Sequence, residues 1–227
     1  MEEHVDVDFS GRSFDRFARS GGVFLRCDFS ETSFQQFSGG HGAQTRFVDC
    51  VFRRTRFPLG NTHFGTARFE RCLFDGARLR DLRVDAAEFI DCTFRGRVWS
   101  TIFSGAPMGL TVLPDRSRNA WHGNDFSGAD LVDVDFRDID LRAQRWPDDR
   151  AEYALIDRVD ERVEAAMAAP DWPDEALRAM RFLRTHGHRD PHGFVLVRRQ
   201  ELGRSLPPQL RDRLWARLVS DYSDDQE

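Results

Sequence analysis

Residues 64–94 read FGTARFERCLFDGARLRDLRVDAAEFIDCTF and carry a large apolar side chain at every fifth position. These positions are Phe64, Phe69, Phe74, Leu79, Val84, Phe89 and Phe94. On an α-helix five residues turn about 500°, so the apolar stripe would drift by about 140° at each step. On a flat strand an odd step sends successive side chains to opposite faces. A regular period that fits neither element indicates a repeat architecture.

The same spacing extends over most of the first 147 residues. It also places Phe9, Phe14, Phe24, Phe29, Phe34, Phe47, Phe52, Phe57, Phe126 and Phe136, with Trp99, Leu131, Leu141 and Trp146 at further steps. A small residue usually stands two positions earlier, as in Ala129-Asp130-Leu131 and Val134-Asp135-Phe136, with a polar residue between the two. A large and a small inward side chain that share a narrow interior would produce this pattern.

These units resemble the pentapeptide-repeat family, whose unit is A(D/N)LXX, and the resemblance extends to an actinobacterial type with a C-terminal helical extension. The resemblance implies a mainly β fold: a right-handed quadrilateral β-helix of about six coils over residues 5–147, followed by an α-helical segment over 148–227. Stacked coils would satisfy their backbone groups across the usual strand spacing of about 4.8 Å.

The four cysteines test the register of the coils. Cys27, Cys50, Cys72 and Cys92 are 23, 22 and 20 residues apart, and Phe29, Phe52, Phe74 and Phe94 have the same separations. We therefore expect both series to be interior columns of the structural core. The cysteines are interpreted as small buried hydrophobes, since no CxxC spacing indicates zinc; the alternative is a redox or metal role.

Two arginines break the pattern. Arg12 and Arg97 occupy positions reserved for small inward residues, where an unpaired charge would be costly. Either the register slips locally by one residue, or the guanidinium groups reach outward to solvent.

Glycine- and proline-rich insertions interrupt the repeat near 38–43, 58–62 and 104–123, and the spacing predicts that all three lie at the same side of the coils. Loops held by a rigid frame are typical of recognition sites, which predicts an interaction edge. The alternative is a corner that merely tolerates insertions.

The candidate interaction residues are His41, His63, Arg116, Arg118, Trp121, His122, Asp130, Asp135 and Asp140. The three loop histidines would form a metal or acid–base site only if they converge. The outward aspartates, five residues apart, would present phosphate-like spacing, or else they simply solvate a β surface.

After Trp146-Pro147 the pattern becomes helical. We expect helices from about 148 to 169, 174 to 185 and from about 207 onward, with 193–197 either a short strand or a helix start. This segment is predicted to cap the open end of the β-helix or to form a homodimer. The histidine-rich run at 186–192 lies in a Gly/Pro turn, so a ligand role is not favoured.

Composition limits the function. The net charge of −5 argues against a polycation that binds nucleic acid directly, no apolar run reaches the roughly 20 residues of a membrane span, and the acidic start lacks a signal-peptide pattern. We expect a cytoplasmic protein.

The sequence lacks a Ser/His/Asp or Cys/His arrangement and a phosphate loop, which predicts a non-enzymatic protein with no cofactor and no metal. The family resemblance implies a protein partner, most concretely DNA gyrase, which related proteins modulate as duplex mimics that confer resistance to topoisomerase poisons. The alternatives are a scaffold or adaptor that uses the loop-bearing face, and an enzyme built on the histidines. Residues 1–147 hold 21 acids and 20 arginines, a near-neutral balance that argues against strong mimicry of DNA.

Overall fold

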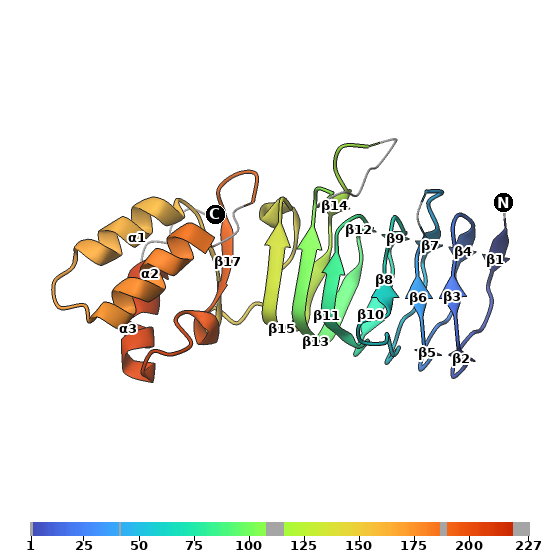
Figure 1. Cartoon of the computed structure of the whole chain (residues 1–227), viewed down its shortest axis with the longest axis horizontal. Coiled ribbons are helices and arrows are strands. Elements are labelled where there is room, and N and C mark those ends of the chain that lie inside the picture. The colour runs from blue at the N-terminus through green and yellow to red at the C-terminus, as the bar shows by residue number, and fades with distance from the viewer. Residues whose placement is uncertain (1, 41, 108–115, 187–189, 220–227) are drawn as a thin grey trace. The chain divides into compact units, whose positions relative to one another are not determined.

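The computed structural model describes residues 2–40, 42–107, 116–186 and 190–219. The chain divides into two compact units, Met1–Pro147 and Asp148–Glu227, and each is described by itself. Figure 1 shows the short strands of the first unit and the helices of the second.

The first unit is a stack of short parallel strands. They are β1 (Glu3–Val5), β2 (Ser13–Phe14), β3 (Phe17–Ala18), β4 (Val23–Leu25), β5 (Ser33–Phe34), β6 (Phe37–Ser38), β7 (Arg46–Val48), β8 (Thr62–His63), β9 (Arg68–Glu70), β10 (Leu73–Asp75), β11 (Leu79–Val84), β12 (Glu88–Ile90), β13 (Thr93–Ser104), β14 (Trp121–His122) and β15 (Asp125–Arg137), followed by a 3₁₀ turn at Leu141–Ala143. One sheet has the order β1-β4-β7-β9-β12-β14, so each strand pairs with the strand one coil further along the chain. Phe24 pairs with Phe47, Phe47 with Phe69, and Phe69 with Phe89, which confirms the mainly β class with parallel pairing.

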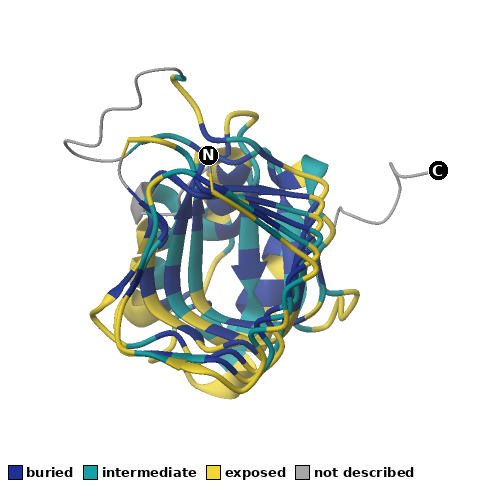
Figure 2. Cartoon of the chain, turned by 90° about the vertical axis from the view of Figure 1, so that its right-hand side faces the viewer, coloured by how far each residue is buried: buried dark blue, intermediate teal, exposed yellow. Residues whose placement is uncertain are grey.

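Aromatic rings fill the interior as continuous columns. Phe29, Phe52, Phe74 and Phe94 stack face to face, with centroid separations of 5.0, 4.9 and 5.1 Å. A second column runs through Phe24, Phe47, Phe69 and Phe89, with separations of 4.9, 4.8 and 4.9 Å. Buried and exposed residues alternate along the coils (Figure 2), as expected when one set of side chains fills the interior. Such stacked rings add to the stabilisation that comes from burying their area.

The smaller inward residues satisfy their polar atoms locally. The Thr55 hydroxyl donates to the Phe29 carbonyl at 2.8 Å, and the thiols of Cys50, Cys72 and Cys92 point at carbonyls of the preceding coil at 3.3, 3.3 and 3.4 Å. All four cysteines are free and buried. Burial raises the pKa of the Cys72 thiol well above its ordinary value.

One corner of the coils carries a ladder of alternating charge. Asp6, Arg26, Asp49, Arg71 and Asp91 all have φ between 51° and 55°, in the left-handed region. This conformation costs a non-glycine residue about 1 kcal/mol or more. Arg26 and Arg71 each bind the preceding aspartate with two nitrogens, at 2.6 and 2.7 Å for Asp6 and at 2.7 and 2.9 Å for Asp49. These bidentate pairs between coils offset part of the strain.

The structure corrects the register in the later coils. Val98 is buried whereas Trp99 is 37% exposed, so the chain slips by one residue beside the exposed Arg97. Phe126 stacks on Phe94 at 4.4 Å and therefore belongs to the same column, not to a later side of the same coil. The physical reason is that the inward residues after Phe94 are Val98, four residues later, and Phe103. Phe103 fills the interior position before the long insertion, so Phe126 falls in the next coil.

The other departures are local. Arg12 reaches outward, with its guanidinium 5.5 Å from the centre of the Phe9 ring. Phe17 of the first coil and Phe37 of the second stack at 5.3 Å and fill the interior. In the first coil the five-residue spacing had assigned this inward position to residue 19. Two insertions therefore share a corner: residues 38–43 follow Phe37 and residues 104–120 follow Phe103. The third, at 58–61, precedes Thr62, which pairs with Phe37, so it lies one corner earlier.

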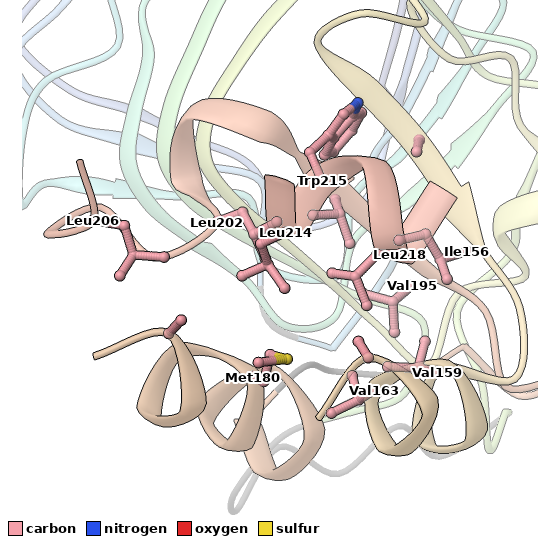
Figure 3. Packing of buried hydrophobic residues seen from close by; sticks show 14 of the residues in the cluster. Ile156, Val159, Val163, Met180, Val195, Leu202, Leu206, Leu214, Trp215 and Leu218 are labelled. Carbon is pink, nitrogen blue, oxygen red and sulfur yellow. The ribbon is translucent and has the colours of Figure 1, made fainter. Parts of the chain in front are cut away.

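The second unit combines helices with a two-stranded antiparallel sheet. It contains β16 (Tyr153–Ile156), α1 (Val159–Ala168), α2 (Asp174–His186), β17 (Val195–Arg198), a 3₁₀ turn at Arg199–Glu201 and α3 (Pro208–Val219). Val163, Met180, Leu214 and Leu218 pack together in its core (Figure 3). The segment expected to be α-helical thus contains three helices and, in addition, two strands.

The sheet of β16 and β17 explains why the segment is not helical throughout. Residues 153–156 alternate between partly buried and buried side chains, and Ile156 pairs with Val195. An alternation of period two identifies a strand. Residues 153–156 therefore do not belong to the helix that was expected from about residue 148. For residues 193–197, which were expected to be either a short strand or a helix start, the strand is observed.

Candidate interaction edge

The ends of the long insertion are joined by a buried asparagine. The side-chain amide of Asn119 donates to the carbonyls of Ser104 and Asp85 at 2.8 and 3.0 Å, and its backbone N–H donates to the Gly105 carbonyl at 2.8 Å. Only 6% of Asn119 is exposed. Residues 108–115 lie outside the described residues, but the base from which they leave the coil is held by these three hydrogen bonds.

A buried glutamate, Glu88 on β12, holds both insertions that share this corner. Its Oε2 accepts from Gln44 Nε2 at 2.9 Å and from Arg68 Nη1 at 3.3 Å. Its Oε1 accepts from the Ala120 backbone N–H at 2.9 Å and lies 3.4 Å from Arg116 Nε. With 4% of the residue exposed, Glu88 links residue 44, after the first insertion, to residues 116 and 120, at the end of the second.

Three of the candidate residues take part in this framework. Trp121 is 6% exposed and packs against Phe89 and Phe103 at 4.8 and 5.1 Å, so it belongs to the core. Arg116 donates to the Ala86 carbonyl at 2.5 Å. Arg118 is exposed and donates to the Asp138 carbonyl at 2.8 Å.

The histidines do not assemble within the described residues. His41 lies outside them. His63 on β8 and His122 on β14 are both exposed, and they belong to different sheets. In the part of the chain that the structure describes, no group of three or more His, Cys, Asp or Glu residues is placed to hold a metal ion.

The described end of the histidine-rich run of the second unit, residues 190–192, lies at a turn. The buried Asp190 carboxylate accepts from the backbone N–H groups of His192 and Phe194 at 2.8 and 2.7 Å, and His192 is exposed. Residues 187–189 lie outside the described residues.

The candidate aspartates are paired with arginine or used in a turn. Asp130 lies 3.2 Å from Arg97, and Asp135 accepts from Arg137 at 2.6 Å. Asp140 caps the 3₁₀ turn by accepting from the Arg142 backbone N–H at 3.0 Å. The three aspartates thus lie among arginines and do not form a continuous acidic strip.

Sequence reasoning missed Glu88, Asn119 and Asn124. Asn124 continues the cysteine column: its side chain accepts from the Cys92 N–H at 3.0 Å and donates to the Phe89 carbonyl at 2.8 Å. An amide in a slot otherwise filled by cysteine was the available signal. Glu88 carried no comparable signal, because an acid beside an inward phenylalanine normally faces solvent.

The fold and this edge define a repeat-built parallel β-structure with loops fixed on one corner, joined to a separate α/β unit. No protein-family model matches the chain, and no curated protein matches it. Among the described residues, no helix is long and apolar enough to cross a membrane.

A comparison with solved structures finds QnrB1, a plasmid-mediated fluoroquinolone resistance protein. A trypsin-treated variant is 17% identical, with a TM-score of 0.29 over 64% of this chain and 79% of that one. A second trypsin-treated variant is 20% identical, with a TM-score of 0.26 over 63% and 79%. The full-length form is 19% identical, with a TM-score of 0.20 over 63% and 81%.

Proposed function

We propose that the chain is a non-enzymatic, protein-binding pentapeptide-repeat protein that acts in the cytoplasm. Its first unit is taken to be a right-handed quadrilateral β-helix of about six coils, in keeping with strands that pair with partners 20 to 23 residues away, such as His4 with Phe24 and Phe24 with Phe47.

One observation carries the proposal. A buried carboxylate, Glu88, and a buried amide, Asn119, fix the ends of insertions at one corner of a stacked-ring core. Burying such groups is costly unless they form hydrogen bonds, and the contacts of the Glu88 carboxylate and the Asn119 amide nitrogen are what hold the ends of these loops in place. Binding residues concentrate on loops held in this way.

The concrete partner that we propose is DNA gyrase, because the five-residue repeat resembles that of proteins that modulate gyrase and protect it from poisons. Asp130 and Asp135 are paired with arginine, which favours contact through a mixed-charge surface over mimicry of a polyanion. The second candidate is an adaptor for another protein, favoured by the near-neutral balance of 21 acids and 20 arginines over residues 1–147. The second unit is proposed to cap the first or to form a homodimer.

The test is gyrase supercoiling and fluoroquinolone-stabilised cleavage with and without the protein. We expect inhibition or protection at micromolar protein. The effect should be lost when residues 107–115 are replaced by two glycines, a change that leaves Arg116 and Asn119 in place. The control is Leu59→Ser, which alters an exposed residue of the insertion at the other corner and should have no effect.

If the wild-type protein has no effect at high concentration, gyrase is not the partner, and the adaptor proposal is pursued by affinity capture. If the glycine replacement retains full activity with an unchanged melting temperature, the long insertion is not the recognition element.

A further inference from the structure

A polar groove of about 620 Å³ lies on the outer surface near β2 and β5, away from the candidate interaction edge. Its lining includes Ser13, Ser33, Arg54, Arg56 and Arg78. Arg56 and Arg78 are exposed.

The register of the coils places three arginines in one row. Ser13 pairs with Ser33 and Ser33 with Arg56. The Arg78 backbone N–H donates to the Thr55 carbonyl, which puts Arg78 beside Arg56, and the pairing of Leu79 with Val98 puts Arg97 beside Arg78. Neighbouring members of this row, Arg56, Arg78 and Arg97, are therefore separated by the strand spacing of about 4.8 Å.

Most arginines on the outer surface of the first unit bind a carboxylate, commonly one from a neighbouring coil. Arg26 binds Asp6, Arg71 binds Asp49 and Arg53 binds Asp75, at 2.6, 2.7 and 3.1 Å. In the row, Arg97 binds Asp130 at 3.2 Å.

Arg56 and Arg78 differ from these, because neither has a carboxylate partner among the residues that the structure describes. Like charges directly opposite each other on paired strands destabilise a sheet. The fold thus places two cations side by side and supplies no anion between them.

An exposed aromatic residue lies beside the row. Trp99 pairs in register with Arg80, whose guanidinium lies 4.0 Å from the centre of the Trp99 ring, and Arg97 lies 5.7 Å from it. Trp99 is 37% exposed, so part of a large apolar side chain remains accessible to a partner. Tryptophan and arginine are the residues that most often dominate the energy of protein interfaces.

We propose that Arg56 and Arg78 of this arginine row, together with the nearby Trp99, dock a short acidic segment of the protein partner. The inference rests on the proposed function as a protein-binding module. A guanidinium group binds a carboxylate with two parallel hydrogen bonds, and two neighbouring arginines suit two neighbouring carboxylates.

An acidic polypeptide fits this row better than a nucleic acid. Stable binding of a nucleic-acid backbone needs many phosphate contacts along a continuous track. Here only two neighbouring arginines, Arg56 and Arg78, have no carboxylate partner among the described residues. On one side Glu31 lies 3.5 Å from Arg54, and on the other Asp130 neutralises Arg97.

The direct test is fluorescence anisotropy of a labelled octaglutamate peptide at low and physiological salt. An octaglutamine peptide controls for charge, and a short random-sequence DNA duplex represents the other class of polyanion. The test variant is Arg56→Gln with Arg78→Gln. The matched control is Arg26→Gln with Arg71→Gln, which removes two exposed arginines that already have aspartate partners.

We expect wild-type protein to bind octaglutamate and not octaglutamine. The Arg56/Arg78 variant should bind about tenfold more weakly, if each lost pair contributes in the usual range for exposed ion pairs. Its melting temperature should be unchanged or higher, since a like-charge contact is removed, and the Arg26/Arg71 control should keep its affinity within about twofold.

The inference is overturned if wild-type protein does not bind octaglutamate, if the Arg56/Arg78 variant binds as well as wild type, or if the DNA duplex binds more tightly than the peptide. The proposed function fails separately, if affinity capture and the gyrase assay yield no protein partner. A wild-type protein that engages a partner, with an Arg56/Arg78 variant that does so equally well, would refute the arginine row alone.

Discussion

Replacing Glu88 by alanine should destabilise the first unit and free the ends of two insertions. The side chain is buried and lies within hydrogen-bonding or ion-pairing distance of Gln44, Arg68, Arg116 and the Ala120 N–H. Alanine removes the carboxylate that contacts all four groups, and it leaves the Gln44 amide and the Ala120 N–H without this acceptor.

The magnitude follows from what each partner retains. Breaking a buried ion pair by removing one partner costs about 3–5 kcal/mol. Arg68 keeps Glu70 at 2.7 Å, and Arg116 keeps the Ala86 carbonyl, so neither guanidinium is left without a partner. We therefore expect the low end, about 3 kcal/mol. Glu88→Gln keeps the size and one acceptor but loses the charge, and should cost about 1–2 kcal/mol.

Two measurements check this prediction. Urea unfolding followed by circular dichroism gives the change in the free energy of unfolding, and hydrogen exchange reports on the Ala120 amide, which should exchange faster than its neighbours in the core. Glu31→Ala is the control, because this glutamate is 65% exposed and pairs with Arg54 at 3.5 Å; its loss should cost less than about 1 kcal/mol. A loss below about 1 kcal/mol for Glu88→Ala, or an unchanged Ala120 amide, would refute the role assigned to Glu88.

Three further results are expected. Phe52→Ala should cost about 3–5 kcal/mol in urea unfolding, and Phe9→Ala clearly less, because Phe52 stacks between two rings and Phe9 stacks face to face on one; equal losses would contradict the column picture. The hydrogen bond from Arg71 lowers the pKa of Asp49, so its stabilisation is present above the ordinary carboxyl pKa of about 4 and is lost as pH falls through the lowered value. The stability difference between wild type and Asp49→Asn should therefore be found at pH 7 and vanish in strong acid, and a difference that persists there would argue against the ion pair. Cys72 should react with a thiol reagent only as the protein unfolds, since burial raises its pKa; rapid reaction of the native protein would show that the column is open.

Spacing alone predicts which side chains point inward where the period is strict. The separations of 23, 22 and 20 residues between Phe29, Phe52, Phe74 and Phe94 leave one way to align these coils, and the rings lie about 5 Å apart in that alignment. The strand spacing of stacked coils has nearly this value, so every inward aromatic meets its equivalent one coil away.

Spacing fails where two neighbouring residues suit the same slot. Val98 and Trp99 are both large and apolar, and the sequence spacing favours Trp99, yet Val98 is the buried one. With Trp99 outside, the same strand, β13, places Phe103 in the interior five residues after Val98, and the start of the long insertion moves to the corner that follows Phe103. A slip of one residue exchanges the inward and outward faces, so an error at one position misplaces every later assignment until the next loop.

The candidate site is harder to predict than the core, because outward residues obey no period. Glu88 and Glu70 are both acids that border an inward phenylalanine on neighbouring coils, yet the Glu88 side chain is 5% exposed and the Glu70 side chain 14%. The difference comes from Gln44 and residues 116–120, which cover Glu88 from insertions whose course the repeat does not specify. Conversely, Trp121 was a natural surface candidate in a loop, and the same insertions place it in the core.

The arginine row follows the same logic at the surface. Arg56 and Arg78 are 22 residues apart in the chain and become neighbours only once the coils are in register. Whether an arginine is paired then depends on which residue the next coil presents: aspartate beside Arg26 and Arg71, but another arginine beside Arg56. Because the stacked rings carry the stability of the core, the outer row can tolerate this unfavourable contact. A β-helix thus separates the residues that fix the fold from those available for recognition, and the positions where coil-to-coil pairing fails are the places to look for a partner.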